Sequence, residues 1–183
     1  VKQGCVLANK AFFAAVHIDC CTLRSTRARG ALIQTQNVLI ENSYIYGISY
    51  AGLLFSPDIK RWWEVAPAEN VEIRNNIFEH CSHASDTMPD GAVSFKASHD
   101  GESGEYPAGV HKNILIHNNR FKDFCGCGIF VSAADSVRIE DNVFERDKTA
   151  QKQGFDIRLV NCRNTKIYNN RDDDFPERLI SIE

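Results

Sequence analysis

Apolar and polar residues alternate with a period of two in several short segments of the chain. In residues 70–78, for example, the apolar Val71 and Ile73 are separated by Glu72 and followed by Arg74. A β-strand places successive side chains on opposite faces, so this pattern predicts strands with one buried face. The residues expected to point inward are Val38, Ile40, Val71, Ile73, Ile114, Ile116, Val137 and Ile139, and those expected to point outward are Leu39, Glu72, Leu115 and Arg138.

The same sequence motif recurs along the chain. It begins at residues 37, 70, 113, 136 and 164, and a sixth segment from residue 15 keeps the apolar positions but lacks the Asn. After each strand comes an Asn or Asp, which tolerates left-handed backbone angles and predicts a turn. We expect the turn residues to stack into an amide ladder, and the inward residues after them to stack in the core. The turn residues are Asn42, Asn75, Asn118, Asp141 and Asn169, and the stacking residues are Ile45, Phe78, Phe121 and Phe144.

A second strand, introduced by Gly, follows in each repeat at residues 30–33, 52–55, 91–95 and 128–131. Its inward face is not determined by the pattern. A β-sandwich would not repeat one phrase so often, and the Leu scaffold of a leucine-rich repeat is absent. The sequence therefore predicts an all-β fold, a right-handed parallel β-helix of five to six coils, as a single domain over residues 1–183.

The two ends of the chain resemble incomplete coils. Residues 4–8 look like a second strand without its first strand, and residues 179–182 look like a final second strand. Solenoids normally carry polar caps at their termini, and neither end has an obvious one. We therefore expect a fragment of a longer helix, truncated on the N-terminal side.

Composition narrows the classes of partner. Apolar residues make up 43% of the chain, charged residues 25%, and the net charge is −3, which argues against nucleic acid. There is no apolar run long enough for a membrane span, and residues 1–15 lack the layout of a signal peptide. The seven cysteines are odd in number and irregularly spaced, so we expect small buried hydrophobes and not a disulfide framework; metal or redox use is the alternative.

Two long insertions, residues 56–69 and 97–112, are expected to leave the stack at the same corner, and a third, residues 79–90, at another. The first contains the charged Asp58, Arg61 and Glu64 beside Trp62 and Trp63. Aromatic rings beside charged groups suit a sugar, whose C–H face packs on the ring while its hydroxyls bond to the charges. The alternative is that a Trp covers the helix as a lid.

Arg27 and Arg29 form a second candidate site in the phrase Arg-Ala-Arg-Gly. In an extended segment their guanidinium groups would project to the same side and could bind carboxylates or hydroxyls. A structural salt bridge to a neighbouring coil is the alternative.

Metal chemistry has little support. His80, Cys81 and His83, with His99 and His111, match no standard zinc spacing, and Cys81 is expected to pack near the core. Residues 172–174 are three consecutive Asp, which we interpret as solvated surface and not as a calcium site. The sequence therefore predicts neither a metal nor a cofactor.

Leu23 to Glu79 resembles a stretch of the bacterial exo-α-1,3-galactosidases. The resemblance rests on Arg-Ala-Arg-Gly at residues 27–30, Ala-Gly-Leu-Leu at 51–54, Trp-Trp-Glu at 62–64 and the Asn-containing strands at 37–42 and 70–76. It implies a secreted or periplasmic glycoside hydrolase that removes terminal α-1,3-linked galactose with inversion, through two carboxyl groups roughly 6.5–9.5 Å apart.

The resemblance also assigns roles to the candidate residues. Arg27, Arg29, Arg61, Trp62 and Trp63 would bind substrate. Glu64, and behind it Asp58, are the local candidates for a catalytic carboxyl group. The essential acids of the family are expected on coils before Arg27, where this chain has no Asp-Asp counterpart, so the chain would carry the later wall of the cleft.

Two other functions remain open, because parallel β-helices support several. One is a non-catalytic glycan-binding or structural β-helix, which needs no carboxyl pair. The other is a polysaccharide lyase, although the strands carry no clear acidic metal cluster. The partner in each case is an oligosaccharide or polysaccharide; the oligomeric state is not determined by the sequence.

Overall fold

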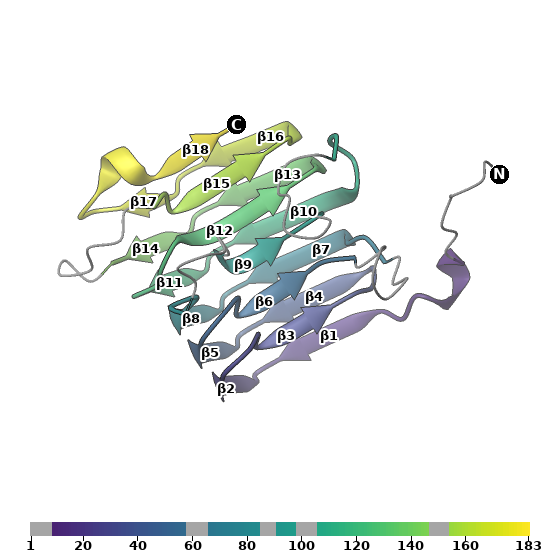
Figure 1. Cartoon of the computed structure of the whole chain (residues 1–183), viewed down its shortest axis with the longest axis horizontal. Coiled ribbons are helices and arrows are strands. Elements are labelled where there is room, and N and C mark those ends of the chain that lie inside the picture. The colour runs from purple at the N-terminus through teal and green to yellow at the C-terminus, as the bar shows by residue number, and fades with distance from the viewer. Residues whose placement is uncertain (1–8, 58–65, 85–90, 98–105, 147–153) are drawn as a thin grey trace.

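The computed structural model describes residues 9–57, 66–84, 91–97, 106–146 and 154–183. Over these residues eighteen strands form three sheets of six strands, and every pairing between neighbours is parallel. The chain enters the three sheets in the same order in each coil, so six coils rise from β1–β3 to β16–β18 (Figure 1). The predicted right-handed parallel β-helix is confirmed.

Sheet A consists of β1 (Val16–Asp19), β4 (Val38–Glu41), β7 (Glu69–Arg74), β10 (His111–His117), β13 (Ala134–Glu140) and β16 (Arg163–Tyr168). Sheet B consists of β2 (Thr22–Thr26), β5 (Tyr44–Ile48), β8 (Ile77–Cys81), β11 (Arg120–Lys122), β14 (Val143–Glu145) and β17 (Arg171–Asp172). Sheet C consists of β3 (Ala31–Ile33), β6 (Leu53–Phe55), β9 (Gly91–Phe95), β12 (Cys127–Ser132), β15 (Ile157–Val160) and β18 (Ile180–Ile182). Two short 3₁₀ helices, η1 (Lys10–Phe12) and η2 (Pro176–Arg178), precede β1 and β18.

The inward residues of sheet A form columns that run through the stack. Ile40 lies between Ile18 and Ile73 in the register, and the column continues through Ile116 and Ile139. The predicted inward residues of this sheet are all buried, whereas the outward residues between them are partly or fully exposed. Because the side-chain period of a strand is two, this register buries the whole apolar set at once.

A second column, of aromatic rings, lines the inner face of sheet B. The rings of Phe78 and Phe121 are 4.9 Å apart, and those of Phe121 and Phe144 are 5.0 Å apart, nearly parallel in both cases. All three rings are buried, as the sequence predicted. A Cβ atom at Gly128 would lie 2.6 Å from the Phe144 ring, so the Gly that introduces this strand makes room for the aromatic column.

The coils differ from the prediction in the number of strands. Each coil has three strands and not two, because the short segment after the turn, which carries the inward Ile or Phe, is itself a strand of sheet B. The strands that Gly was expected to introduce are those of sheet C. Their inward face, which the sequence left open, carries Leu53, Phe55, Ile129 and Val131.

The amide ladder exists, but it is built from the residue after the predicted one. Asn75 and Asn118 have left-handed backbone angles, with φ of 56° and 53°, and their side chains are exposed. The next residues turn inward: the Nδ2 atom of Asn76 donates a hydrogen bond of 3.0 Å to Oδ1 of Asn119. The ladder runs through Ser43, Asn76, Asn119 and Asn142, which are buried, and ends at the partly buried Asn170.

The long insertions leave the stack where the sequence placed them. Those after β6 and β9 both lie between sheet C and sheet A, and that after β8 lies between sheet B and sheet C. The predicted terminal strand at residues 179–182 is confirmed as β18, whereas residues 4–8 lie outside the described residues. No helix in the described part of the chain is long and apolar enough to cross a membrane.

Candidate functional site

Arg27 and Arg29 lie at the corner between sheet B and sheet C, after β2 and before β3. The corner is a bend and not an extended segment, so the condition under which both side chains would project to the same side is not met. Its backbone is fixed by bonds of 3.1 Å from the Tyr50 amide to the Ala28 carbonyl and 3.2 Å from the Thr26 hydroxyl to the Arg29 carbonyl. Both arginine side chains are exposed, and among the described residues neither makes an ion pair.

The last residue of the Arg-Ala-Arg-Gly motif, Gly30, is required by the close packing of two coils. A Cβ atom at this position would lie 2.4 Å from the carbonyl oxygen of Gly52 in the next coil. The Gly30 amide donates to the Ala51 carbonyl at 3.0 Å, which ties the corner to that coil. Gly30 therefore lets the two coils approach closely. Its hydrogen bond fixes the position of residues 27–30, the arginine corner, along the axis of the β-helix.

Sheet C connects the arginine corner to the first long insertion. Strand β3 begins just after Arg29, and the insertion begins at the opposite end of the neighbouring strand, β6. On the outer face between them Leu32 and Leu54 are paired in register, and Leu32 is 44% exposed. A strand of three residues spans about 10 Å, so the arginine corner and the insertion flank one short apolar strip.

The candidate site residues of the first insertion lie outside the described residues. Asp58, Arg61, Trp62, Trp63 and Glu64 all fall in residues 58–65, and their predicted roles remain predictions. The ends of the insertion are packed: Pro57, Ala66 and Ala68 are buried.

A separate cavity lies on the outer face of sheet C, near β12 and β15 in the last coils. It has a volume of about 440 Å³ and is lined by Cys127, Phe155, Arg158 and Arg178, among others. Arg158 is held by two hydrogen bonds, of 3.0 and 2.9 Å, to the Glu183 carboxylate. Burial raises the pKa of the Cys127 thiol to about 12, so it is the neutral thiol and a weak nucleophile at neutral pH.

Two of the residues considered for a metal do come together, since the ring centroids of His80 and His83 are 4.6 Å apart, but within the described ranges they form no group of three possible ligands at metal-binding distance. The Cys81 thiol is buried, as expected, and donates to the Ile45 carbonyl, while burial raises its pKa to about 12. His80 instead bonds to Asp123, with 3.0 Å between Nδ1 and Oδ2. His111 is buried in the core, where Nδ1 accepts from the Ala68 amide and Nε2 donates to the Lys96 carbonyl. His99 lies outside the described residues.

The interpretation of residues 172–174 as solvated surface is wrong for Asp172. This residue is only 4% exposed, because it occupies the inward position that Phe144 holds in the preceding coil. Its Oδ1 atom accepts hydrogen bonds of 2.9 Å from the amides of Asp174 and Phe175. Asp173 and Asp174 are exposed as expected.

Asp172 interacts with a second buried carboxyl group, that of Asp156. Asp156 is fully buried and accepts a hydrogen bond of 2.8 Å from Arg146 Nε. Burial and, to a smaller extent, the neighbouring Asp172 raise the pKa of Asp156 to about 7 despite the attraction of Arg146. A carboxyl group with no exposed surface cannot reach a substrate, so we assign this cluster to the core of the last coils.

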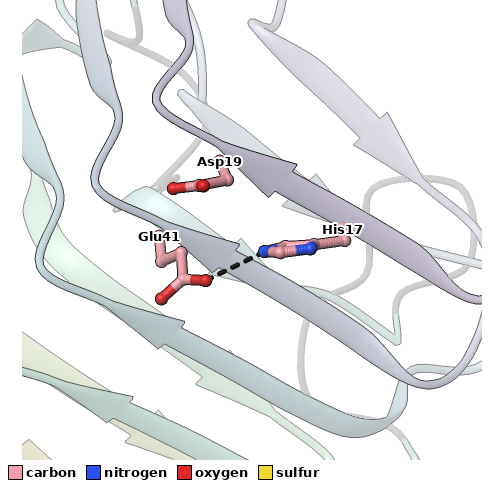
Figure 2. A group of neighbouring side chains, drawn as sticks. All are labelled: His17, Asp19 and Glu41. Atoms are coloured by element: carbon pink, nitrogen blue, oxygen red, sulfur yellow. Dashed lines mark hydrogen bonds and ion pairs between the residues drawn. The ribbon is translucent and has the colours of Figure 1, made fainter.

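A group that the sequence did not single out lies on the outer face of sheet A, at the start of the helix. His17 and Asp19 of β1 and Glu41 of β4 point to the same side (Figure 2), and their nitrogen and oxygen ligand atoms all lie within 4.8 Å of one another. Within the described ranges it is the one His, Cys, Asp and Glu group that meets this criterion. The sequence repeat already indicated this group, because outward-pointing residues two positions apart on one strand lie beside the outward-pointing residues of the paired strand in the next coil.

Comparison with known proteins gives the chain a family. Residues 5–174 match the model of the right handed beta helix region. The alpha-1,3-galactosidase A of Bacteroides thetaiotaomicron is 30% identical over 174 residues, which cover 93% of this chain and 29% of that protein. The alpha-1,3-galactosidase B of the same organism is 28% identical over 190 residues, and that of Akkermansia muciniphila is 27% identical over 175 residues.

These matches cover 100% and 93% of this chain and 30% and 22% of the two B proteins. The chain thus spans less than a third of the length of these relatives. It belongs to the right-handed β-helix family, and alpha-1,3-galactosidases A and B are among its homologues.

Proposed function

We propose that this chain forms part of the substrate-binding wall of a glycoside hydrolase that removes terminal α-1,3-linked galactose. The observation that carries the proposal is the extent of the similarity: 93% of the chain aligns with an alpha-1,3-galactosidase A at 30% identity. The similarity covers nearly the whole chain at this identity, whereas fold alone would not indicate a function.

The arginine corner supports binding of a polar ligand. Arg27 and Arg29 are exposed without an ion-pair partner in the described part of the chain, so their guanidinium donors are available to sugar hydroxyls. The adjoining strip of Leu32 and Leu54 offers an apolar surface to the C–H face of a sugar ring. Arg61, Trp62 and Trp63, at the other end of β6, would supply the aromatic side of the same site.

The proposed reaction is an inverting hydrolysis. One carboxylic acid would protonate the leaving oxygen, and one carboxylate would activate water on the opposite face of the sugar, roughly 6.5–9.5 Å away. Glu64 is the first candidate in this chain for one of the two groups and Asp58 the second. The partner is an oligosaccharide with a terminal galactose, and we propose a secreted or periplasmic location.

Substrate binding and turnover test the proposal separately. Titration with α-1,3-galactobiose measures binding, and release of galactose followed by NMR reports both the rate and the anomeric configuration of the product. Arg27→Ala and Arg29→Ala should raise KM, and Glu64→Gln should abolish turnover while binding persists. Arg24 is an exposed arginine on β2, and Arg24→Ala is the matched control. This variant should change neither KM nor turnover.

The alternatives give different results. Binding without hydrolysis in the longest natural form of the protein would favour the non-catalytic glycan-binding function. Products with unsaturated ends, formed only with calcium, would indicate the lyase. If Arg24→Ala impairs binding as strongly as Arg27→Ala, the arginine corner is not the binding wall.

A further inference from the structure

The outer face of sheet A carries three possible metal ligands from two neighbouring coils. His17 and Asp19 are two residues apart on β1, so both side chains leave the same face of the strand. Asp19 is paired in register with Glu41 on β4, and His17 Nε2 lies 2.9 Å from Glu41 Oε1. Figure 2 shows the three side chains converging over the two strands.

The two carboxylates of this group repel each other, and the Arg74 guanidinium beside Glu41 offsets part of that charge. Asp19 and Glu41 lie directly opposite each other on adjacent strands, where like charges destabilise a sheet. A cation held between the two carboxylates would offset this repulsion.

Neighbouring side chains orient each carboxylate without blocking it. Arg74 donates to Glu41 Oε2 and leaves Oε1 toward His17. Asn42 and the Cys20 thiol both donate to Asp19 Oδ1. Metal-binding carboxylates and histidines are typically held by such outer hydrogen bonds.

We propose that His17, Asp19 and Glu41 bind a divalent transition-metal ion, with zinc as the best match. One imidazole nitrogen and two carboxylate oxygens are ligands that zinc accepts, and three protein ligands leave a position open for water. Magnesium and calcium prefer sets made only of oxygen atoms, so the imidazole selects against them. The bound ion would link β1 to β4 and so the first coil to the second.

Zinc titration of the purified chain near neutral pH, followed by calorimetry, tests the site directly. We expect saturable binding of one zinc ion, little response to magnesium, and a higher melting temperature with zinc than without it. His17→Gln and Glu41→Gln should each weaken zinc binding by about tenfold or more. Cobalt should give visible absorption bands in the wild-type chain that are lost in the same variants.

His80→Gln is the matched control. His80 forms an exposed His–carboxylate pair with Asp123 at 3.0 Å, as His17 does with Glu41. In the described part of the chain, however, no third possible ligand lies close enough to complete a metal site with this pair. It should leave zinc binding unchanged. Circular dichroism of every variant in the absence of metal shows whether the fold is retained.

The exposed thiols of Cys20 and Cys21 provide the decisive check. Zinc binding that persists in the Cys20→Ser, Cys21→Ser double variant supports the His17 site. Loss of binding in that double variant, or equal binding by wild type and His17→Gln, would overturn the proposal. So would the failure of a folded wild-type chain to bind zinc.

Discussion

Asn76 and Asn119 lie one above the other inside the turn between sheet A and sheet B, both buried, with 3.0 Å between the Nδ2 atom of the first and the Oδ1 atom of the second. The same oxygen also accepts the backbone amide of Asn76 at 3.0 Å. Above Asn119, the Asn142 side chain repeats both bonds. Each amide thus pairs buried polar groups of the coil below it, which would otherwise be left without partners.

Asn119→Ala should lower the free energy of unfolding by about 2–5 kcal/mol, because several buried polar groups lose their partners together. Urea denaturation measures the change. Asn118→Gly, one residue earlier, is the control: its side chain is exposed and its backbone is left-handed, with φ of 53°, which Gly adopts freely. Equal losses in the two variants would contradict a role for the ladder in stability.

Gly128→Ala should also destabilise the chain, by about 1–3 kcal/mol, because the new methyl group would meet the Phe144 ring at 2.6 Å. Combining it with Phe144→Leu should cost less than the sum of the two single changes, since the smaller side chain relieves the contact. Gly47→Asn is the control, because Asn tolerates its φ of 63° and the nearest atom would be 3.8 Å away. Strict additivity would show that the contact does not limit packing.

Stability should depend on pH through two buried groups with opposite effects. The pKa of Asp156 is raised to about 7, so between 3.8 and about 7 the folded chain holds a proton that the unfolded chain has released, and stability falls as pH rises. Burial lowers the pKa of His111 to about 4, so between about 4 and 6.5 the unfolded chain holds the extra proton, and stability rises with pH. The two contributions largely cancel in the wild-type chain.

Single substitutions should separate the two contributions. Asp156→Asn removes the first, so its stability should rise with pH between about 4 and 6.5. His111→Gln removes the second, so its stability should fall as pH rises from 3.8 to about 7. Urea denaturation at a series of pH values measures both slopes. Parallel curves for the two variants would show that these groups do not govern the pH response.

Two pairs of cysteines should differ in their reactivity. Cys20 and Cys21 are exposed, whereas Cys81 and Cys127 are buried and their pKa values are raised to about 12. Alkylation of the native chain followed by mass spectrometry should label Cys20 and Cys21, with Cys20 the slower because its hydrogen bond to Asp19 raises its pKa. Cys81 and Cys127 should be labelled only when the chain unfolds. Rapid labelling of Cys81 in native buffer would mean that the core opens near β8.

The regular part of the fold could be predicted from the sequence because one rule, alternation at a period of two, repeats over the strands of sheet A. The inward Ile40 and Ile73 follow directly from that rule. The rule fails at the pair Asn75 and Asn76, since two identical residues in a turn do not reveal which side chain points inward. The backbone decides it: the first takes the left-handed conformation, which turns the second into the core.

The candidate sites depended on information of another kind. The packing of Cys81 could be expected from its place after Phe78, but the inward position of Asp172 contradicted the usual meaning of an acidic run. The His17, Asp19 and Glu41 group was missed because Glu41 is 22 to 24 residues from the other two and meets them only through the register of β1 and β4. Trp62 and Glu64 still rest on the sequence alone.

The corner between sheet C and sheet A tolerates connections of very different length. A single residue, Ala133, joins β12 to β13, whereas the connection from β6 to β7 runs from Ser56 to Ala68, and the strands on both sides keep the same pairing. Stability in such a stack comes mainly from contacts between neighbouring coils. New recognition loops can therefore be exchanged at this corner, by evolution or by grafting, while the strands that carry them stay in place.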